Sequence, residues 1–136
     1  MYKYGKNSLA KIETVDETLQ LICHKAIEIM NNKHPKSHKV DFGISCGIRT
    51  LAIQKEMFAQ GKSKADGVNN KSYHQYGLAV DFYAYVDGKA NYDLVNIQAI
   101  ALCFLQAASF YNVESRWGGH FSTIYDSPHF ELPMIP

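Results

Sequence analysis

Two short segments of the sequence contain residue types that bind metal ions. The first segment has His74 and, seven positions later, Asp81, with Gly77 between them. The second segment, near the C-terminus, has His129. Two imidazoles and a carboxylate form the three-ligand set that catalytic zinc uses, with water in the fourth position. The two segments therefore predict a Zn²⁺ site, and Gly77 would let the backbone turn so that the side chains of the first segment converge.

A hydrolytic zinc site also needs a base and a group that stabilises the developing oxyanion. Asp126 precedes His129 by three residues, and a turn containing Pro128 could direct its carboxylate toward the attacking water. Glu131 would share a face with His129 on a strand, where it could orient that ligand. Arg49 is the best-placed cation for the oxyanion. Spacing alone leaves the alternative open that these are ordinary histidines and carboxylates without a metal.

The segments that must position these residues alternate between helical and extended patterns. A capping box from Thr14 to Glu17 followed by apolar residues at helical spacing predicts a helix that ends near Asn31. Further helices are predicted over 51–60 and 92–111, and strands over 40–45, 78–85, 113–117 and 129–132, with 121–125 as strand or loop. Residues 1–13 are expected to be irregular or extended. This order predicts an α+β fold with a small, largely antiparallel sheet packed against helices.

Composition limits the organisation and the partners of the protein. A length of 136 residues predicts a single domain over 1–136. A net charge of +1 gives no basis for nucleic-acid binding, and the longest apolar run, 99–105, is too short for membrane insertion. Three cysteines without a CxxC pair predict free thiols. The N-terminal segment lacks the apolar stretch of a signal peptide, and we expect a monomer.

The histidine segment resembles a known family signature. Ser72-x-His74-x-x-Gly77-x-Ala79-x-Asp81 is similar to the SxHxxGxAxD motif of the M15 zinc peptidases. That family includes D-Ala-D-Ala carboxypeptidases and dipeptidases and the L-alanyl-D-glutamate endopeptidases of bacteriophages. Other segments resemble it in the same order, namely Ser45-Cys-Gly-Ile-Arg49-Thr50 followed by Gln54, Trp117-Gly-Gly, and Asp126-Ser-Pro-His129. The resemblance covers residues 40–132 and implies the fold shared by DD-peptidases and the hedgehog signalling domain.

The resemblance also implies roles for individual residues. It implies zinc bound by His74, Asp81 and His129, with Asp126 as the general base and Arg49 as the stabiliser of the transition state. It places Ser72, Gln54 and Trp117 as candidate substrate contacts, although Ser72 could instead cap a local turn and Trp117 could be a core or cleft-wall aromatic. Two positions depart from the family pattern. The turn reads Ser-Cys-Gly-Ile-Arg instead of Ser-Gly-Tyr-Arg, and the base is Asp, as in the phage enzymes, instead of Glu.

We therefore expect a zinc-dependent peptidoglycan peptidase that cuts the L-Ala-D-Glu bond of the stem peptide, as bacteriophage endolysins do. Such an enzyme would accumulate in the host bacterial cytoplasm and act on the cell wall after the membrane is permeabilised. The first alternative is a D-Ala-D-Ala carboxypeptidase or dipeptidase of the same family. The second is a zinc-stabilised cell-wall-binding module without turnover, which the retained Asp126 argues against.

Overall fold

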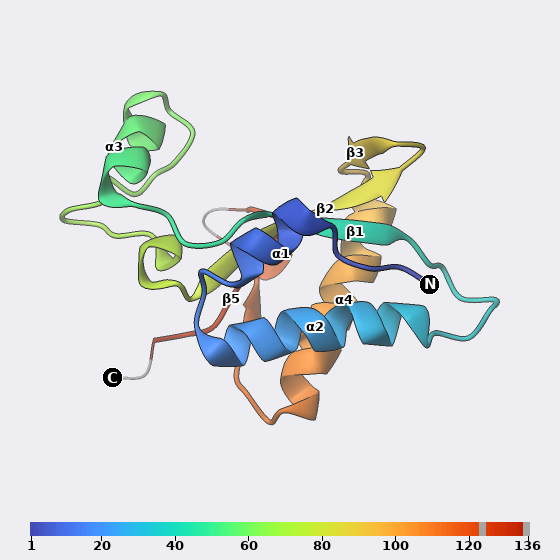
Figure 1. Cartoon of the computed structure of the whole chain (residues 1–136). Coiled ribbons are helices and arrows are strands. Elements are labelled where there is room, and N and C mark those ends of the chain that lie inside the picture. Colours follow the sequence, from blue (N-terminus) through green and yellow to red (C-terminus); the bar gives the residue numbers. More distant parts are fainter. Residues whose placement is uncertain (123–124, 135–136) are drawn as a thin grey trace.

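The computed structural model describes residues 1–122 and 125–134 and shows an α+β fold (Figure 1). The helices are α1 (Lys6–Ile12), α2 (Glu17–Asn31), α3 (Leu51–Ala59) and α4 (Leu94–Phe110), with the short 3-10 helices η1 (Tyr73–Tyr76) and η2 (Gly118–His120). The strands are β1 (Asp41–Cys46), β2 (Ala79–Val86), β3 (Lys89–Asn91), β4 (Arg116–Trp117) and β5 (His129–Glu131).

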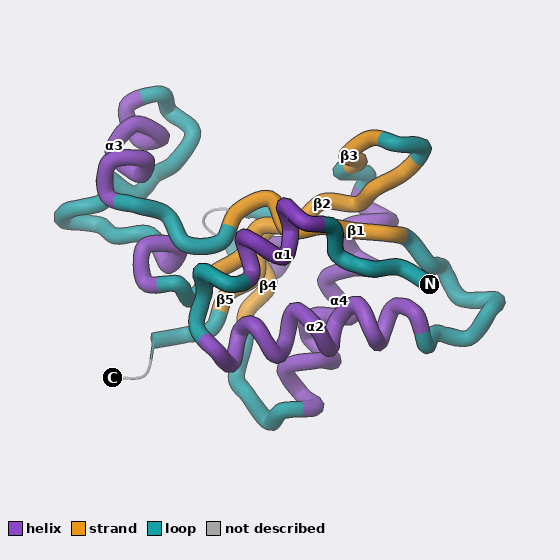
Figure 2. The backbone as a smooth tube through the Cα atoms, viewed as in Figure 1, coloured by secondary structure: helices purple, strands orange, loops and turns teal. Residues whose placement is uncertain are grey.

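The strands form one antiparallel sheet in the order β1-β2-β5-β4, and β3 pairs with the far end of β2 through a tight turn. In Figure 2 the strands gather in the middle of the molecule, and α2 and α4 lie together on one side of them. The expected fold class, a small antiparallel sheet packed with helices, is confirmed.

The core lies between the sheet and the α2–α4 layer. Phe82 of β2 stacks on Phe104 of α4 with ring centroids 5.3 Å apart, and Phe130 of β5 contacts the same ring at 5.1 Å. All three rings are fully buried. Burial of an aromatic side chain is worth roughly 1.5–3 kcal/mol, so this cluster fixes β2 and β5 firmly against α4.

The N-terminal region differs from the expectation of an irregular entry. Residues Lys6–Ile12 form α1, which buries Ile12 and packs on β1. The side chain of Ser8 on α1 accepts a hydrogen bond from Ile44 N. A helix of seven residues is too short for periodicity to reveal it, and its stability comes from this contact with the sheet.

The start of α2 also differs from the prediction. Asp16, not Thr14, is its N-cap, and the Asp16 side chain accepts a hydrogen bond from Thr18 N. The Thr14 hydroxyl instead donates to Lys11 O and accepts from Ile48 N. Thr14 thus connects the end of α1 with the turn that leads to Arg49, which is a tertiary role that the local pattern does not indicate.

Other predicted elements hold with small changes. The helix predicted over 51–60 is found as α3 (Leu51–Ala59), and the helix predicted over 92–111 is found as α4 (Leu94–Phe110). The strand predicted over 113–117 is limited to Arg116–Trp117, and β3 was not predicted. Residues 123–124 of the predicted strand or loop over 121–125 lie outside the described residues. None of the helices in the described ranges is long and apolar enough to cross a membrane, and Cys23, Cys46 and Cys103 are free.

Candidate active site

Cross-strand pairing brings the two predicted ligand segments together. Asp81 of β2 lies directly opposite His129 of β5 in the antiparallel register. Directly opposite residues share a face of the sheet, with Cβ atoms about 5 Å apart. The neighbouring residues Val80, Phe82 and Phe130 point to the other face and are fully buried in the core. The sheet therefore separates an apolar face, which holds the fold, from a polar face, which carries the site.

His74 reaches the same face from η1, which precedes β2. Ser72 caps η1: its side chain accepts from His74 N, while Gln75 reaches back to Ser72 N in a capping box. Gly77 follows in the left-handed conformation with φ +69°, which other residues adopt only with strain. The expected backbone turn at Gly77 is present, and Ser72 takes the capping role that was left open as its alternative.

Two of the predicted ligands, His74 and His129, converge on one carboxylate oxygen of the third, Asp81. Asp81 Oδ1 lies 3.1 Å from His74 Nε2 and 3.1 Å from His129 Nδ1. Each imidazole directs its second nitrogen to a different acceptor, since His74 Nδ1 lies 2.9 Å from Gly47 O and His129 Nε2 lies 2.7 Å from Glu131 Oε1. An acceptor at the second nitrogen fixes the tautomer and leaves the facing nitrogen with its lone pair, which is how metal-binding histidines are held.

This donor set fits a zinc ion. It offers two imidazole nitrogens and one carboxylate, with Asp126 close by: Asp126 Oδ2 lies 3.8 Å from His129 Nδ1. Two groups of residues could each hold a metal ion here, Cys46–His74–Asp81 and Asp81–Asp126–His129. Within each group, the potential ligand atoms lie within 4.8 Å of one another. Neither group contains all three predicted ligands. Asp81 belongs to both groups, His74 to the first and His129 to the second.

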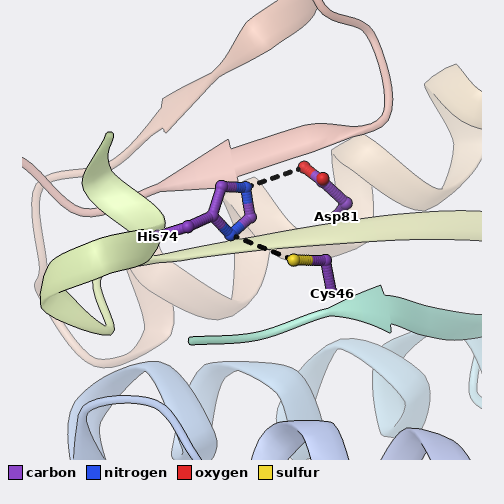
Figure 3. Close-up of side chains that lie close together, drawn as sticks. All are labelled: Cys46, His74 and Asp81. Atoms are coloured by element: carbon purple, nitrogen blue, oxygen red, sulfur yellow. Dashed lines mark hydrogen bonds and ion pairs between the residues drawn. The ribbon is translucent and has the colours of Figure 1, made fainter. Parts of the chain in front are cut away.

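Cys46 is a neighbour of the site that sequence analysis assigned only to a turn. A β-bulge between Ile44 and Cys46 places Cys46 opposite Asp81 in the register of β1 and β2. Its Sγ lies 3.7 Å from His74 Nδ1, on the side of the ring away from the Nε2–Asp81 contact, as Figure 3 shows. Because Nδ1 also faces Gly47 O, the geometry favours Nε2 as the nitrogen that faces a metal.

The electrostatics of the site favour a bound cation. Burial lowers the pKa of His74, but hydrogen bonds to Asp81 and Cys46 outweigh it and raise the pKa to about 10. Burial raises the pKa of Asp81, but hydrogen bonds from His129 and His74 outweigh it and lower that pKa well below its usual value. Without a metal, protonated histidines therefore supply the positive charge, because the partly buried carboxylate of Asp81 needs a cationic partner.

Arg49 lies at the edge of the site and is held on several sides. One guanidinium nitrogen, Nη2, lies 3.6 Å from Asp81 Oδ2, and the other, Nη1, donates to Gln54 Oε1 at 2.9 Å. Arg49 N donates to His74 O at 2.9 Å. Arg49 is 8% exposed and lines the cleft. A fixed guanidinium beside the ligands can stabilise an oxyanion without reorganisation during the reaction.

Asp126 lies on the segment that leads to β5. Burial and the charge of Asp81 raise the pKa of its carboxyl above the ordinary value, which moves it toward the range of an effective general base. Gly118 fixes this segment: its carbonyl accepts from Asp126 N at 3.1 Å, and a Cβ at Gly118 would lie 1.9 Å from Asp126 O. The Trp-Gly-Gly motif is thus needed for close packing against the segment of the base.

Two predicted substrate contacts are placed elsewhere. Gln54 is fully buried; its side chain accepts from Arg49 and donates to Ser63 Oγ and Ala65 O. Trp117 is 8% exposed, and its indole donates to Ser127 O. Neither is among the residues that line the cleft, because each packs behind the cleft wall. Both side chains thus form hydrogen bonds behind the cleft wall, and their direct contact with a substrate stays a prediction.

The cleft above the ligands has a volume of about 850 Å³, within the size range of ligand sites. It lies between the segment that joins α3 to η1 and the described residues 120–122 and 125–126. Arg116 also lines it and forms an ion pair with the buried Glu131, its cross-strand neighbour. Arg116 was not predicted as a site residue, because a pairing between β4 and β5 is not visible in local spacing.

Comparison with known proteins points to one family. A model of phage L-alanyl-D-glutamate peptidases matches residues 1–132. The L-alanyl-D-glutamate peptidase of Escherichia phage T5 is 32% identical over 143 residues, which cover 96% of this chain and 98% of that protein. The peptidoglycan L-alanyl-D-glutamate endopeptidase CwlK of Bacillus subtilis is 32% identical over 108 residues, covering 71% of this chain and 62% of CwlK.

Two solved structures resemble the fold. The L-Ala D-Glu endopeptidase ChiX of Serratia marcescens superposes with a TM-score of 0.80 at 27% identity, over 96% of this chain and 90% of ChiX. The vancomycin-resistance D,D-dipeptidase VanXYg superposes with a TM-score of 0.55 at 17% identity, over 87% of this chain and 50% of VanXYg. The second likeness concerns the fold alone.

Proposed function

Because this chain belongs to the phage L-alanyl-D-glutamate peptidase family, we propose that its cleft is the active site of a zinc-dependent peptidoglycan endopeptidase. The bond cut is the one between L-Ala and D-Glu of the stem peptide. The observation that carries the zinc assignment is the convergence of His74 Nε2 and His129 Nδ1 on Asp81 Oδ1, each with its second nitrogen held by an acceptor.

His74, Asp81 and His129 would hold the zinc ion, which would supply a Lewis acid able to lower the pKa of a water to about 7 and to polarise the scissile carbonyl. Asp126 then takes the proton of the attacking water and returns it to the leaving amine of D-Glu. Arg49 donates hydrogen bonds to the oxyanion that develops on the carbonyl oxygen. Glu131 accepts from His129 throughout and so keeps that imidazole oriented.

The proposal includes the place of action. As in a phage endolysin, the enzyme would be made in the host bacterial cytoplasm and would reach the cell wall after the inner membrane is permeabilised. The likeness to the phage T5 enzyme over nearly the whole chain supports this. The D-Ala-D-Ala alternative has only the fold likeness to VanXYg in its favour, so the endopeptidase is preferred.

Muropeptide digestion tests the proposal. Purified stem peptides incubated with the zinc-loaded enzyme should yield a new N-terminal D-Glu by mass spectrometry, whereas release of D-alanine or its dimer would indicate the other activity. Asp126→Ala should retain stoichiometric zinc and lose cleavage, because only the base is removed. His129→Ala should lose both. Full cleavage by Asp126→Ala would remove Asp126 from the mechanism, and full zinc content in His129→Ala would remove His129 from the ligand set.

A further inference from the structure

We propose that Lys62, Lys64 and Lys71, which we call the cleft lysines, bind the free carboxylate of the D-Glu residue in the substrate. All three line the cleft and all three are exposed. They lie on the segment between α3 and η1, which forms one wall above the ligands. The inference rests on the proposed function and adds to it the residues that recognise the substrate's charge.

The chemistry of the substrate requires a cation near the reacting bond. A glutamate residue whose amino group forms the scissile bond still has two carboxyl groups. The continuing peptide uses one of them, so the other remains free and negatively charged at neutral pH. Standard bond lengths place that carboxylate roughly 2.5–5 Å from the scissile nitrogen. It therefore enters the cleft together with the scissile bond.

The two arginines of the cleft are already engaged. Arg49 is held by Asp81 and Gln54 and is assigned to the oxyanion. Arg116 forms an ion pair with the buried Glu131 and lies over the ring of Tyr73 at 5.2 Å. The cations that remain in the cleft without a carboxylate partner among the described residues are those of the cleft lysines.

The cleft lysines lie close in the sequence to residues that build the site. Lys71 precedes the ligand His74 by three residues. Lys62 and Lys64 flank Ser63, whose hydroxyl accepts from Gln54 at 2.8 Å, and Gln54 in turn accepts from Arg49 at 2.9 Å. Ser63, the residue between these two lysines, is therefore connected to the oxyanion-binding arginine through two hydrogen bonds. We expect a carboxylate adjacent to the scissile bond to come within reach of the cleft lysines, because these lysines line the same cleft as the ligands.

The backbone of the lysine segment is fixed rather than free. Asp66 Oδ1 accepts three backbone hydrogen bonds, from Val68, Asn69 and Asn70, each at 2.9 Å. Gln75 of η1 donates to Gly67 O at 3.0 Å. Fixing the segment in advance lowers the entropy lost when a ligand binds, so exposed lysines here can contribute more than lysines on a mobile loop.

Charge distribution in the cleft supports the same assignment. The carboxylates of the cleft, Asp81, Asp126 and Glu131, lie on the β2 and β5 side. Asp81 faces His74, His129 and Arg49, and Glu131 faces Arg116 and His129. The lysine wall thus presents positive charge to a substrate, and complementary charge selects and orients an anionic ligand.

The experiment compares two synthetic stem peptides that differ only at the free carboxyl group of D-Glu, which is a carboxylate in one and a carboxamide in the other. The zinc-loaded wild-type enzyme should cleave the carboxylate peptide about tenfold more efficiently, through a lower KM at unchanged kcat. Each of Lys62→Gln, Lys64→Gln and Lys71→Gln should reduce this preference by about twofold to fivefold, and the triple variant should abolish it. The preference should also fall with added salt.

Two controls separate charge recognition from damage to the fold. Lys89→Gln alters an exposed lysine in the β3 hairpin, so the preference should stay at the wild-type value. Lysine-to-arginine variants of the cleft lysines should restore it. If the wild-type enzyme cleaves both peptides equally, or if the triple variant keeps the full preference, the lysine assignment is overturned while the proposed function stands. If the enzyme cuts neither peptide between L-Ala and D-Glu, the proposed function itself fails.

Discussion

Removing the carboxylate that holds His129 should weaken zinc binding without removing a metal ligand. Glu131 is 6% exposed, and its Oε1 accepts from His129 Nε2 at 2.7 Å. Glu131→Ala leaves that imidazole free to rotate and to change tautomer. Loss of such a supporting contact typically costs 10–100-fold in metal affinity, which corresponds to about 1.4–2.8 kcal/mol. The expected result is therefore a zinc dissociation constant raised by one to two orders of magnitude.

The assay is competition for zinc between the protein and a chromophoric chelator at fixed pH. Glu131→Gln is the matched variant, because the amide oxygen can still accept from His129, and it should bind zinc within about tenfold of wild type. Arg116→Ala removes the ion pair on the outer side of Glu131 and the contact with the ring of Tyr73, and it leaves the Glu131–His129 hydrogen bond in place. Since the Arg116 side chain is 46% exposed, its loss should change zinc affinity by less than about fivefold.

The outcomes separate two roles of Glu131. Wild-type affinity in Glu131→Ala would refute the reasoning that this contact fixes the nitrogen that faces the metal. Equal and complete loss of zinc in both Glu131→Ala and Glu131→Gln would make Glu131 a direct ligand. Saturating zinc should restore most cleavage to Glu131→Ala, because the ligands, the base and the oxyanion donor are all still present.

Three further predictions concern the ligands and the residues that position the site. In the metal-free protein the pKa of His74 is raised to about 10, so its contribution to stability is complete below about pH 6.5 and is lost as the pH rises toward 10. Urea unfolding of the metal-free protein should show this loss, and zinc affinity should rise over the same range because zinc displaces the proton. Gln54→Ala should cost about 3 kcal/mol in the free energy of unfolding and lower kcat at nearly constant zinc content, because three buried hydrogen bonds are lost; unchanged kcat would contradict its positioning role. Gly118→Ala should abolish cleavage, because its Cβ would lie 1.9 Å from Asp126 O, whereas Gly5→Ala, with no atom within 4 Å, should be neutral; a Gly118→Ala enzyme with wild-type turnover would show that the base tolerates displacement.

Local patterns in the sequence were sufficient for the elements that are long or strongly patterned. The helical periodicity after Val15 and the apolar run over 92–111 correspond to α2 and α4. The short α1 and the N-cap Asp16 were not predicted correctly. Both depend on contacts with β1 and with the turn before Arg49, and a contact across 30 or more residues leaves no mark on local spacing.

The chemistry of the site was present in the sequence as residue types and intervals. Two histidines and nearby carboxylates predicted a metal site, because zinc accepts only a few ligand types, but spacing alone left ordinary histidines as an alternative. The resemblance of the ordered motifs to the M15 zinc peptidases decided for a hydrolase. The interval between His74 and Asp81, with Gly77 inside it, was short enough for local geometry to bring the two together.

Only the tertiary structure decided how these residues face one another. The register of β2 against β5 places His129 opposite Asp81, and the register of β4 against β5 places Arg116 opposite Glu131. The tertiary structure also buries Gln54 and Trp117 behind the cleft and leaves the cleft lysines on the cleft wall. The physical reason is that side chains alternate between the two faces of a sheet, so a shift of one residue in the pairing of β5 would turn His129 and Glu131 toward the core.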